Sequence, residues 1–345
     1  MDKRIEKSPV PKQSILSFQI LQKATVLFLL VGLGLFASLR SPTFFTWANL
    51  VDNLLTNAAV LGIVAIGMTF VMVAGGFDLS VGSMTVVCMV VLVIAMDFLS
   101  PYGAIVAIGG AILLTALVGM GLGAINGMLV SYVGVNPFVV TLSTMLVFRG
   151  LALILTGGGQ SIQVADHGLR DRFTELVFDK QFPIFGLEHQ VSMPIVIFLI
   201  VFCVGIYLLK FTRFGHYLYA MGGNEEATWL AGVSTHRLKA ATYAVCGLTC
   251  AFAAAIILAN TTSAEASSRM GMELEVIASV IVGGTPLGGG SGGLVSTLIG
   301  LMLLRLIVNL MTQFEIGAEY RPVVTGLIIL VVVIIDVLAK KRSQK

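Results

Sequence analysis

Long apolar runs, separated by short polar segments, constrain this chain more than any other feature. A helix that crosses the hydrocarbon core of a bilayer needs about 20 apolar residues, with a range of roughly 17–25. Runs close to that length recur between residues 24 and 339. We therefore predict an all-α fold, a polytopic transmembrane helix bundle with little mass outside the membrane.

The composition agrees with a lipid environment. Hydrophobic residues make up 57% of the 345 residues and charged residues only 11%, against about 25% charged in a typical soluble domain. The mean hydropathy is +0.97. A soluble protein of this length could not hide so much apolar surface, so lipid must be part of its solvent. The chain also lacks a basic stripe interleaved with aromatic residues, which argues against nucleic-acid binding.

The apolar runs predict about ten membrane crossings. The eighth candidate, 274–284, is too short to span unless it starts earlier, is broken or is re-entrant. Residues 24–339 are expected to form a single transmembrane domain, between an N-terminal cytoplasmic segment at 1–23 and a cytoplasmic tail at 340–345. The candidate spans lie near 24–39, 54–74, 79–98, 103–132, 138–156, 193–209, 240–261, 274–284, 293–311 and 322–339.

The distribution of Lys and Arg predicts the orientation of the bundle. With an even number of crossings and the N-terminus in the cytoplasm, about twice as many Lys and Arg fall inside as outside, as the positive-inside rule requires. Two loops are long: an outer loop at 157–192 and a cytoplasmic loop at 210–239. The outer loop is expected to hold a short amphipathic helix, with apolar residues Val164, Phe173, Leu176 and Val177.

Two glycine-rich breaks interrupt the apolar pattern where spans end on the predicted inner side. One covers residues 75–83 and the other residues 283–293. Paired breaks in the two halves of a membrane protein indicate a transport pathway or its hinges. They can also be two ordinary tight turns, with Asp78 and Ser80 capping a helix. The candidate pathway or hinge residues in the breaks are Gly75, Gly76, Asp78, Ser80, Gly82, Gly283, Gly284 and Gly288.

A few polar residues lie within or near the spans, where they are costly. Arg149 and Arg305 lie in mid-span, and Asn57 and Asn126 lie in or near other spans. They are candidates for a polar pathway through the bundle. The alternative is pairing between helices or snorkelling to an interface.

Glycine also marks a packing face. Gly119, Gly123 and Gly127 recur at four-residue spacing in the fourth span. Small residues at that spacing let two helix backbones approach closely in lipid. We therefore expect a tight helix–helix contact along this face.

The chain carries no recognisable catalytic or metal-binding pattern. It contains no Gly-Lys dipeptide and so no Walker A phosphate loop, and its four histidines lie in the two long loops, two in each, without ligand spacing. No ladder of acidic residues runs through the spans, as a proton relay would need. The four cysteines lie in apolar runs and are interpreted as small hydrophobic residues. We expect a protein that is not an enzyme and that binds no metal or cofactor.

The cytoplasmic loop contains one well-patterned helix. Asn224 is a good N-cap, the two acidic residues that follow it lie in the favoured first turn, and Gly232 is placed to end the helix. Trp229 and Leu230 give this helix an exposed apolar face. A helix of two turns is not stable alone in water, so it must pack on the bundle's own surface or on a soluble partner.

Several motifs in the chain are similar to one family. Residues 226–232, Glu-Ala-Thr followed by Gly four residues after the Thr, resemble the Glu-Ala-Ala-x-x-x-Gly loop of ATP-binding-cassette importer permeases. Residues 75–83 resemble the Gly-Gly-Ile-Asp-Leu-Ser-Val-Gly signature of the ribose/xylose/galactoside-type permeases. The likeness continues in order through residues 44–338, with further matching motifs at 136–142, 149–150, 219–224 and 274–278.

This resemblance implies a function and partners. A member of this family is a permease subunit in the bacterial inner membrane that imports a monosaccharide or similar small polyol by alternating access. It pairs with a second permease subunit, expected to be an identical copy, and with a cytoplasmic ATPase that uses the ATP. A periplasmic or lipid-anchored binding protein delivers the sugar. The residues that would contact the ATPase are Gly223, Asn224, Glu225, Glu226, Ala227, Trp229 and Gly232.

Three departures from the family pattern leave the identity of the sugar open. Phe77 replaces a small aliphatic residue, Thr228 replaces Ala, and Pro286 with extra glycines loosens the second break. An ion-coupled secondary transporter and a membrane receptor or scaffold remain as other functional classes.

Overall fold

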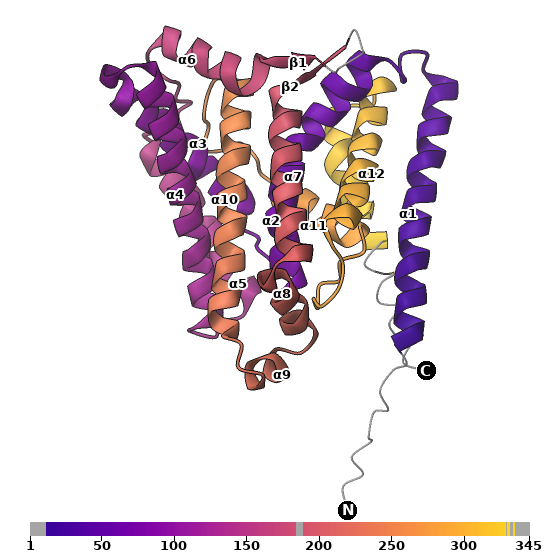
Figure 1. The fold of residues 1–345 in the computed structure, drawn as a ribbon. Helices are drawn as coiled ribbons and strands as arrows, with labels where there is room; N and C mark the ends of the chain where they lie inside the picture. The colour runs from indigo at the N-terminus through magenta and orange to yellow at the C-terminus, as the bar shows by residue number, and fades with distance from the viewer. Residues whose placement is uncertain (1–11, 184–188, 329, 332–333, 335–345) are drawn as a thin grey trace, which may run out of the picture.

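Helices make up most of the described chain (Figure 1). The structure is a computed structural model that describes residues 12–183, 189–328, 330–331 and 334, with the side chains of residues 12–25 and 318 outside that description. The predicted tail at 340–345 and the first eleven residues of the predicted N-terminal segment lie outside the described residues.

Seven helical segments among the described residues are long and apolar enough to cross a membrane. This confirms a polytopic, nearly all-α protein. The segments are η1 (Ala48–Leu55) continuing into α2 (Thr56–Val73), α3 (Val81–Leu99) with η2 (Ser100–Tyr102), α4 (Ala104–Ser131), α5 (Pro137–Leu155), α7 (Met193–Phe211), α10 (Thr235–Thr261) and α12 (Leu294–Gln313).

The other three predicted spans are shorter in the described residues. Helix α1 (Lys12–Arg40) begins earlier than predicted, and its described apolar part is Val26–Arg40. Helix α11 (Met272–Val282) has 11 residues, which is too short to span, as its sequence indicated. A final helical stretch follows η4 (Ala318–Tyr320) and is described continuously only to residue 328. The count of ten crossings therefore stays a prediction.

The bundle has a buried centre and an apolar perimeter. Helices α2, α3 and α10 are mostly buried, whereas most residues of α4, α5 and α7 are at least partly exposed. A helix that is apolar all round belongs in a protein core or in lipid. The exposed apolar surface of the outer helices, with Ile154 of α5 at 77% exposure, is therefore a lipid-facing surface.

The predicted glycine face of α4 packs against α10. A Cβ atom on Gly123 would overlap the backbone carbonyl of Tyr243, and one on Gly127 would lie 2.7 Å from Cα of Ala240. Gly119 makes the same kind of approach at Gly247. The prediction of a tight helix–helix contact is confirmed.

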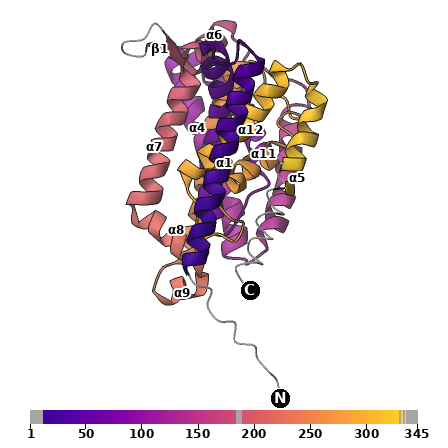
Figure 2. The ribbon, with the colours of Figure 1, turned by 90° about the vertical axis from the view of Figure 1, so that its right-hand side faces the viewer.

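One end of the bundle is covered by the loop between α5 and α7. It contains α6 (His167–Thr174), η3 (Glu175–Asp179) and an antiparallel pair of short strands, β1 (Gln181–Pro183) and β2 (Gln190–Ser192) (Figures 1 and 2). Val164, Phe173 and Val177 are buried against the bundle and Leu176 is exposed. The predicted amphipathic helix of this loop is therefore present.

The opposite end carries two short helices, α8 (Arg213–Gly223) and α9 (Glu225–Leu230), which connect α7 to α10. Helix α1 begins at this same end of the bundle (Figures 1 and 2).

Candidate functional site

The first break, between α2 and α3, is built around a buried carboxylate. Oδ1 of Asp78 accepts hydrogen bonds from the backbone N–H of Ser80 at 2.8 Å and from its hydroxyl at 2.6 Å. Nδ2 of Asn126, on α4, donates to Oγ of Ser80 at 2.8 Å and lies 3.3 Å from Oδ2 of Asp78. A buried carboxylate is costly unless it is hydrogen-bonded, so these three side chains fix the break in one conformation.

This geometry corrects the simple capping alternative for Asp78 and Ser80. Ser80 is the N-cap residue of α3, but its side chain makes no capping hydrogen bond to the helix. Its hydroxyl is used between Asp78 and Asn126 instead. The break is therefore held by tertiary contacts with α4 and is more than a locally capped turn.

A buried tyrosine on α10 closes the first break from the other side. The hydroxyl of Tyr243 donates to the carbonyl oxygen of Phe77 at 3.1 Å. A Cβ atom on Gly76 would lie 2.8 Å from that hydroxyl, so Gly76 provides the space the tyrosine occupies.

The second break, between α11 and α12, also depends on close backbone approach. A Cβ atom on Gly283 would lie 2.6 Å from the carbonyl carbon of Ser296, so this glycine lets α11 pack directly on α12. Gly284 has φ +95°, a conformation that favours glycine. Gly288 has open space around it, and no contact explains its predicted role.

The two breaks meet each other and the end of α8. The backbone N–H of Gly290 donates to the carbonyl oxygen of Val73, at the end of α2, at 2.9 Å. A Cβ atom on Gly289 would lie 2.6 Å from N of Gly75, and one on Gly290 would lie 2.9 Å from N of Gly223. Such distances allow only glycine. We call this meeting point the glycine junction, formed by Gly75, Gly222, Gly223, Gly289 and Gly290.

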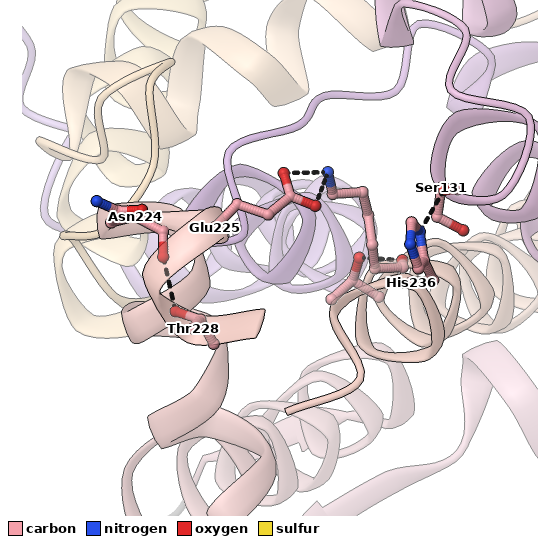
Figure 3. Close-up of polar contacts among 7 residues, drawn as sticks. Ser131, Asn224, Glu225, Thr228 and His236 are labelled. Atoms are coloured by element: carbon pink, nitrogen blue, oxygen red, sulfur yellow. Dashed lines mark hydrogen bonds and ion pairs between the residues drawn. The ribbon is translucent and has the colours of Figure 1, made fainter. Parts of the chain in front are cut away.

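Helix α9 begins immediately after the glycine junction, and Figure 3 shows its N-cap residue Asn224 together with Glu225 and Thr228. Oδ1 of Asn224 accepts a hydrogen bond from the backbone N–H of Ala227 at 2.9 Å, and Oγ1 of Thr228 donates to the carbonyl oxygen of Asn224 at 2.7 Å. Gly232 has φ +85° two residues after the helix ends. The predicted N-cap and the predicted end of this helix are both confirmed.

The start of α10 holds α9 in place. Nζ of Lys239 lies 2.7 Å from both carboxylate oxygens of Glu225, and Nδ1 of His236 donates to the carbonyl oxygen of Ser131 (Figure 3). Glu225 is thereby attached to α10, and α10 to the end of α4. The position of α9 is thus linked to two of the long helices.

The far side of α9 is apolar and uncovered. Trp229 is 58% exposed and Leu230 is 71% exposed, and Glu226 is exposed beside them. The sequence left two alternatives for this apolar face, the bundle's own surface or a soluble partner. Within the described part of the chain, the bundle's own surface leaves it exposed.

The polar residues within the spans have different partners. Nη1 of Arg149, on α5, donates to the carbonyl oxygens of Ala266 and Ser268 and so holds the loop that precedes α11. Arg305, on α12, forms an ion pair with Glu275 on α11. Both arginines therefore make contacts between elements, which the sequence offered as the alternative to a pathway.

Asn57 and Arg305 also line a polar pocket. The pocket has a volume of about 310 Å³ and lies between α2, α10, α11 and α12. Small-molecule sites typically occupy about 300–1,000 Å³. The pocket is therefore large enough for a small solute.

Comparison with protein families assigns the chain to a family of membrane permeases. The family model described as "Branched-chain amino acid transport system / permease component" matches residues 50–333. The chain belongs to this permease family. No solved structure matches the chain.

Curated relatives of this permease are named for sugar import. The ribose import permease protein of Escherichia coli (strain K12) is 34% identical over 92% of this chain and 94% of its own length. The ribose import permease protein of Bacillus subtilis (strain 168) is 35% identical over 92% and 91%. The xylose transport system permease protein of Escherichia coli (strain K12) is 30% identical over 87% and 90%.

The predicted pathway and hinge residues of the permease lie in separate places. Asp78, Ser80 and Asn126 lie together in the first break, while Gly75 belongs to the glycine junction. Gly82 lies against Glu273, so it serves packing between α3 and α11. The break residues and the pocket residues are thus two different sites.

Several residues of these sites were not singled out from the sequence. Tyr243 and Glu275 gave no signal beyond being polar groups in apolar surroundings. Arg269 lies in a loop and Arg321 begins the last described helical stretch, and Arg is ordinary at both kinds of position. Their roles depend on contacts between distant segments. A search for unpaired cations near broken helices could have found the two arginines.

Proposed function

We infer that the chain is the permease subunit of an ATP-binding-cassette importer that moves a monosaccharide or similar small polyol into the cell. The family description names amino acids, but the relatives that cover most of this chain are named for ribose and xylose. Their similarity supports the sugar class.

The observation that carries the proposal is the placement of α9. It is a capped helix with an uncovered apolar face, and it follows directly from the glycine junction where both breaks meet. As the coupling helix, α9 would sit in a cleft of a separate cytoplasmic ATPase. ATP would be bound and used by that subunit, and this chain would need no cofactor of its own.

The contacts suggest how force on α9 opens the bundle. Force on α9 would be transmitted to α8 through the glycine junction and to α10 through the Glu225–Lys239 ion pair. The junction contacts the ends of both breaks, so α2 and α12 would tilt together and expose the pathway to alternate sides. Tightly packed elements of this kind switch between discrete arrangements.

The orientation follows from the same placement. The end with α8, α9 and the start of α1 would face the cytoplasm, in agreement with its excess of Lys and Arg. Both termini would be cytoplasmic, with about ten crossings of the bacterial inner membrane. The end with α6, β1 and β2 would receive a sugar-binding protein from outside. The family resemblance further implies that two copies of the permease form a homodimer within the lipid bilayer.

Uptake by reconstituted vesicles tests this proposal. The permease is reconstituted together with the ATPase and the binding protein encoded beside it. ATP is placed on the side of the membrane where the ATPase lies, and accumulation of labelled ribose and xylose is measured. We expect accumulation that requires ATP, the ATPase and the binding protein. Accumulation that persists without the ATPase and collapses with an ion gradient would make the chain a secondary transporter, and no flux at all would favour a receptor or scaffold.

A further inference from the structure

The polar pocket between α2, α10, α11 and α12 lies at the end of the bundle away from α9, where α2 and α11 begin and α10 ends. This is the end that would face the outside. The polar residues that line it come from six separate segments, and they are Asn57, Asn260, Arg269, Glu275, Arg305 and Arg321.

The pocket has an excess of positive charge. Three arginines and one glutamate line it. Glu275 is paired with Arg305, and within the described part of the chain neither Arg269 nor Arg321 has a carboxylate partner. Two guanidinium groups therefore share one recess without a counter-ion.

Hydrogen-bond donors in the pocket are left unused. The buried Nε atoms of Arg269, Arg305 and Arg321 have no acceptor in the described residues. A buried donor without an acceptor costs the desolvation of that group. The side chain of Asn260 is also without a hydrogen-bond partner among the residues described. An oxygen-rich ligand would supply the missing acceptors.

Arg269 is held in an unusual backbone conformation. Its φ is +61°, in the left-handed region that bulky residues rarely adopt. Burial lowers the pKa of its guanidinium because it removes solvent, and Arg269 forms no ion pair among the described residues that would offset this loss. Backbone strain of this kind concentrates at ligand-binding positions. The loop thus keeps a costly cation at the pocket wall.

We propose that this pocket binds a small polyhydroxy carboxylate, a sugar acid, with its carboxylate between Arg269 and Arg321 and its hydroxyls on Asn57, Asn260 and Glu275. The inference rests on the proposed transport function and narrows its substrate class. The guanidinium fork matches a carboxylate with two parallel hydrogen bonds. A neutral sugar would leave both cations without a counter-ion.

Binding of a matched pair of probes to the purified permease in lipid nanodiscs tests the proposal. The probes are D-ribose and D-ribonate, which differ at the oxidised carbon, and affinity is measured by ligand-observed NMR. We expect ribonate to bind about tenfold more tightly than ribose, a difference of about 1.4 kcal/mol. Arg269→Gln and Arg321→Gln should each remove this preference. Arg172→Gln, an exposed arginine on α6 outside the pocket, is the matched control and should keep it.

Each other result overturns the proposal. Equal affinity for the two probes, tighter binding of ribose, or an unchanged preference in both pocket variants would show that the pocket does not select a carboxylate. A recess that only docks an acidic protein loop would leave free ribonate unbound. Thermal unfolding of each variant shows whether it is folded. The vesicle assay above fails independently if the chain is not an importer subunit, so the two failures can be told apart.

Discussion

The glycine junction makes a sharp prediction at two adjacent residues. A Cβ atom on Gly222 would overlap the carbonyl oxygen of Val73 and the backbone N of Gly290, whereas a Cβ atom on Gly223 would meet nothing within 4 Å. Gly222→Ala and Gly223→Ala thus add the same methyl group to neighbouring positions of α8. Only the first places it inside the junction.

The expected cost of Gly222→Ala follows from what must move. Real Cβ atoms do not approach other atoms closer than 3.0 Å, so the neighbouring backbone has to withdraw. Overpacking of this kind costs about 1–3 kcal/mol, and loss of the hydrogen bond from Gly290 to Val73 adds about 1 kcal/mol. We expect a destabilisation of about 2–4 kcal/mol in total. Gly223→Ala should change the free energy of unfolding by less than about 1 kcal/mol.

Unfolding of the purified protein by SDS in mixed micelles measures this difference, and uptake by the reconstituted complex measures its effect on transport. Gly222→Ala should lower both the unfolding free energy and the uptake rate, while Gly223→Ala should resemble the wild type in unfolding. Equal unfolding curves for the two variants would refute the close approach of α8 to both breaks.

The remaining predictions concern stability and use the same unfolding assay. Gly123→Ala should destabilise the protein by about 1–3 kcal/mol because α4 and α10 must separate. Gly121→Ala is the control, since Gly121 has open space around it, and it should not destabilise the protein; equal effects of the two variants would contradict the packing of α4 on α10. Asn126→Leu should cost about 1–3 kcal/mol because Asp78 and Ser80 lose a buried donor, and a neutral result would show that the carboxylate is satisfied without it. Lys239→Ala should cost less than about 1 kcal/mol because its ion pair with a half-exposed carboxylate is largely screened; a larger loss would mean that this pair holds α9 more strongly than a screened surface ion pair does.

Local chemistry allowed α9 to be predicted in detail. The cap at Asn224, the end near Gly232 and the apolar face at Trp229 all depend on residues within one short segment. Each signal has a local physical cause, such as an unsatisfied backbone N–H or a positive φ. The structure reproduces all three.

Contacts between distant segments could not be predicted in the same way. Gly222 and Gly289 each lie where backbone closely approaches backbone, but the sequence does not say which backbone. The partner of Arg305 could not be predicted either, although the sequence showed that a charged residue within a membrane span is costly. Its partner Glu275 lies in another helix, and the packing of α11 on α12 decides that they meet.

Substitutions at the exposed face of α9 show directly whether the bundle is driven through this helix. ATP hydrolysis and sugar uptake are measured with the double variant Trp229→Ala and Leu230→Ala, and with Leu146→Ala and Ile154→Ala on the lipid-facing side of α5 as a control that removes similar exposed apolar area. We expect the α9 variant to insert and fold but to lose uptake and stimulation of the ATPase, while the control keeps both. Normal uptake and stimulation by the α9 variant would contradict the claim that the bundle is driven through this helix.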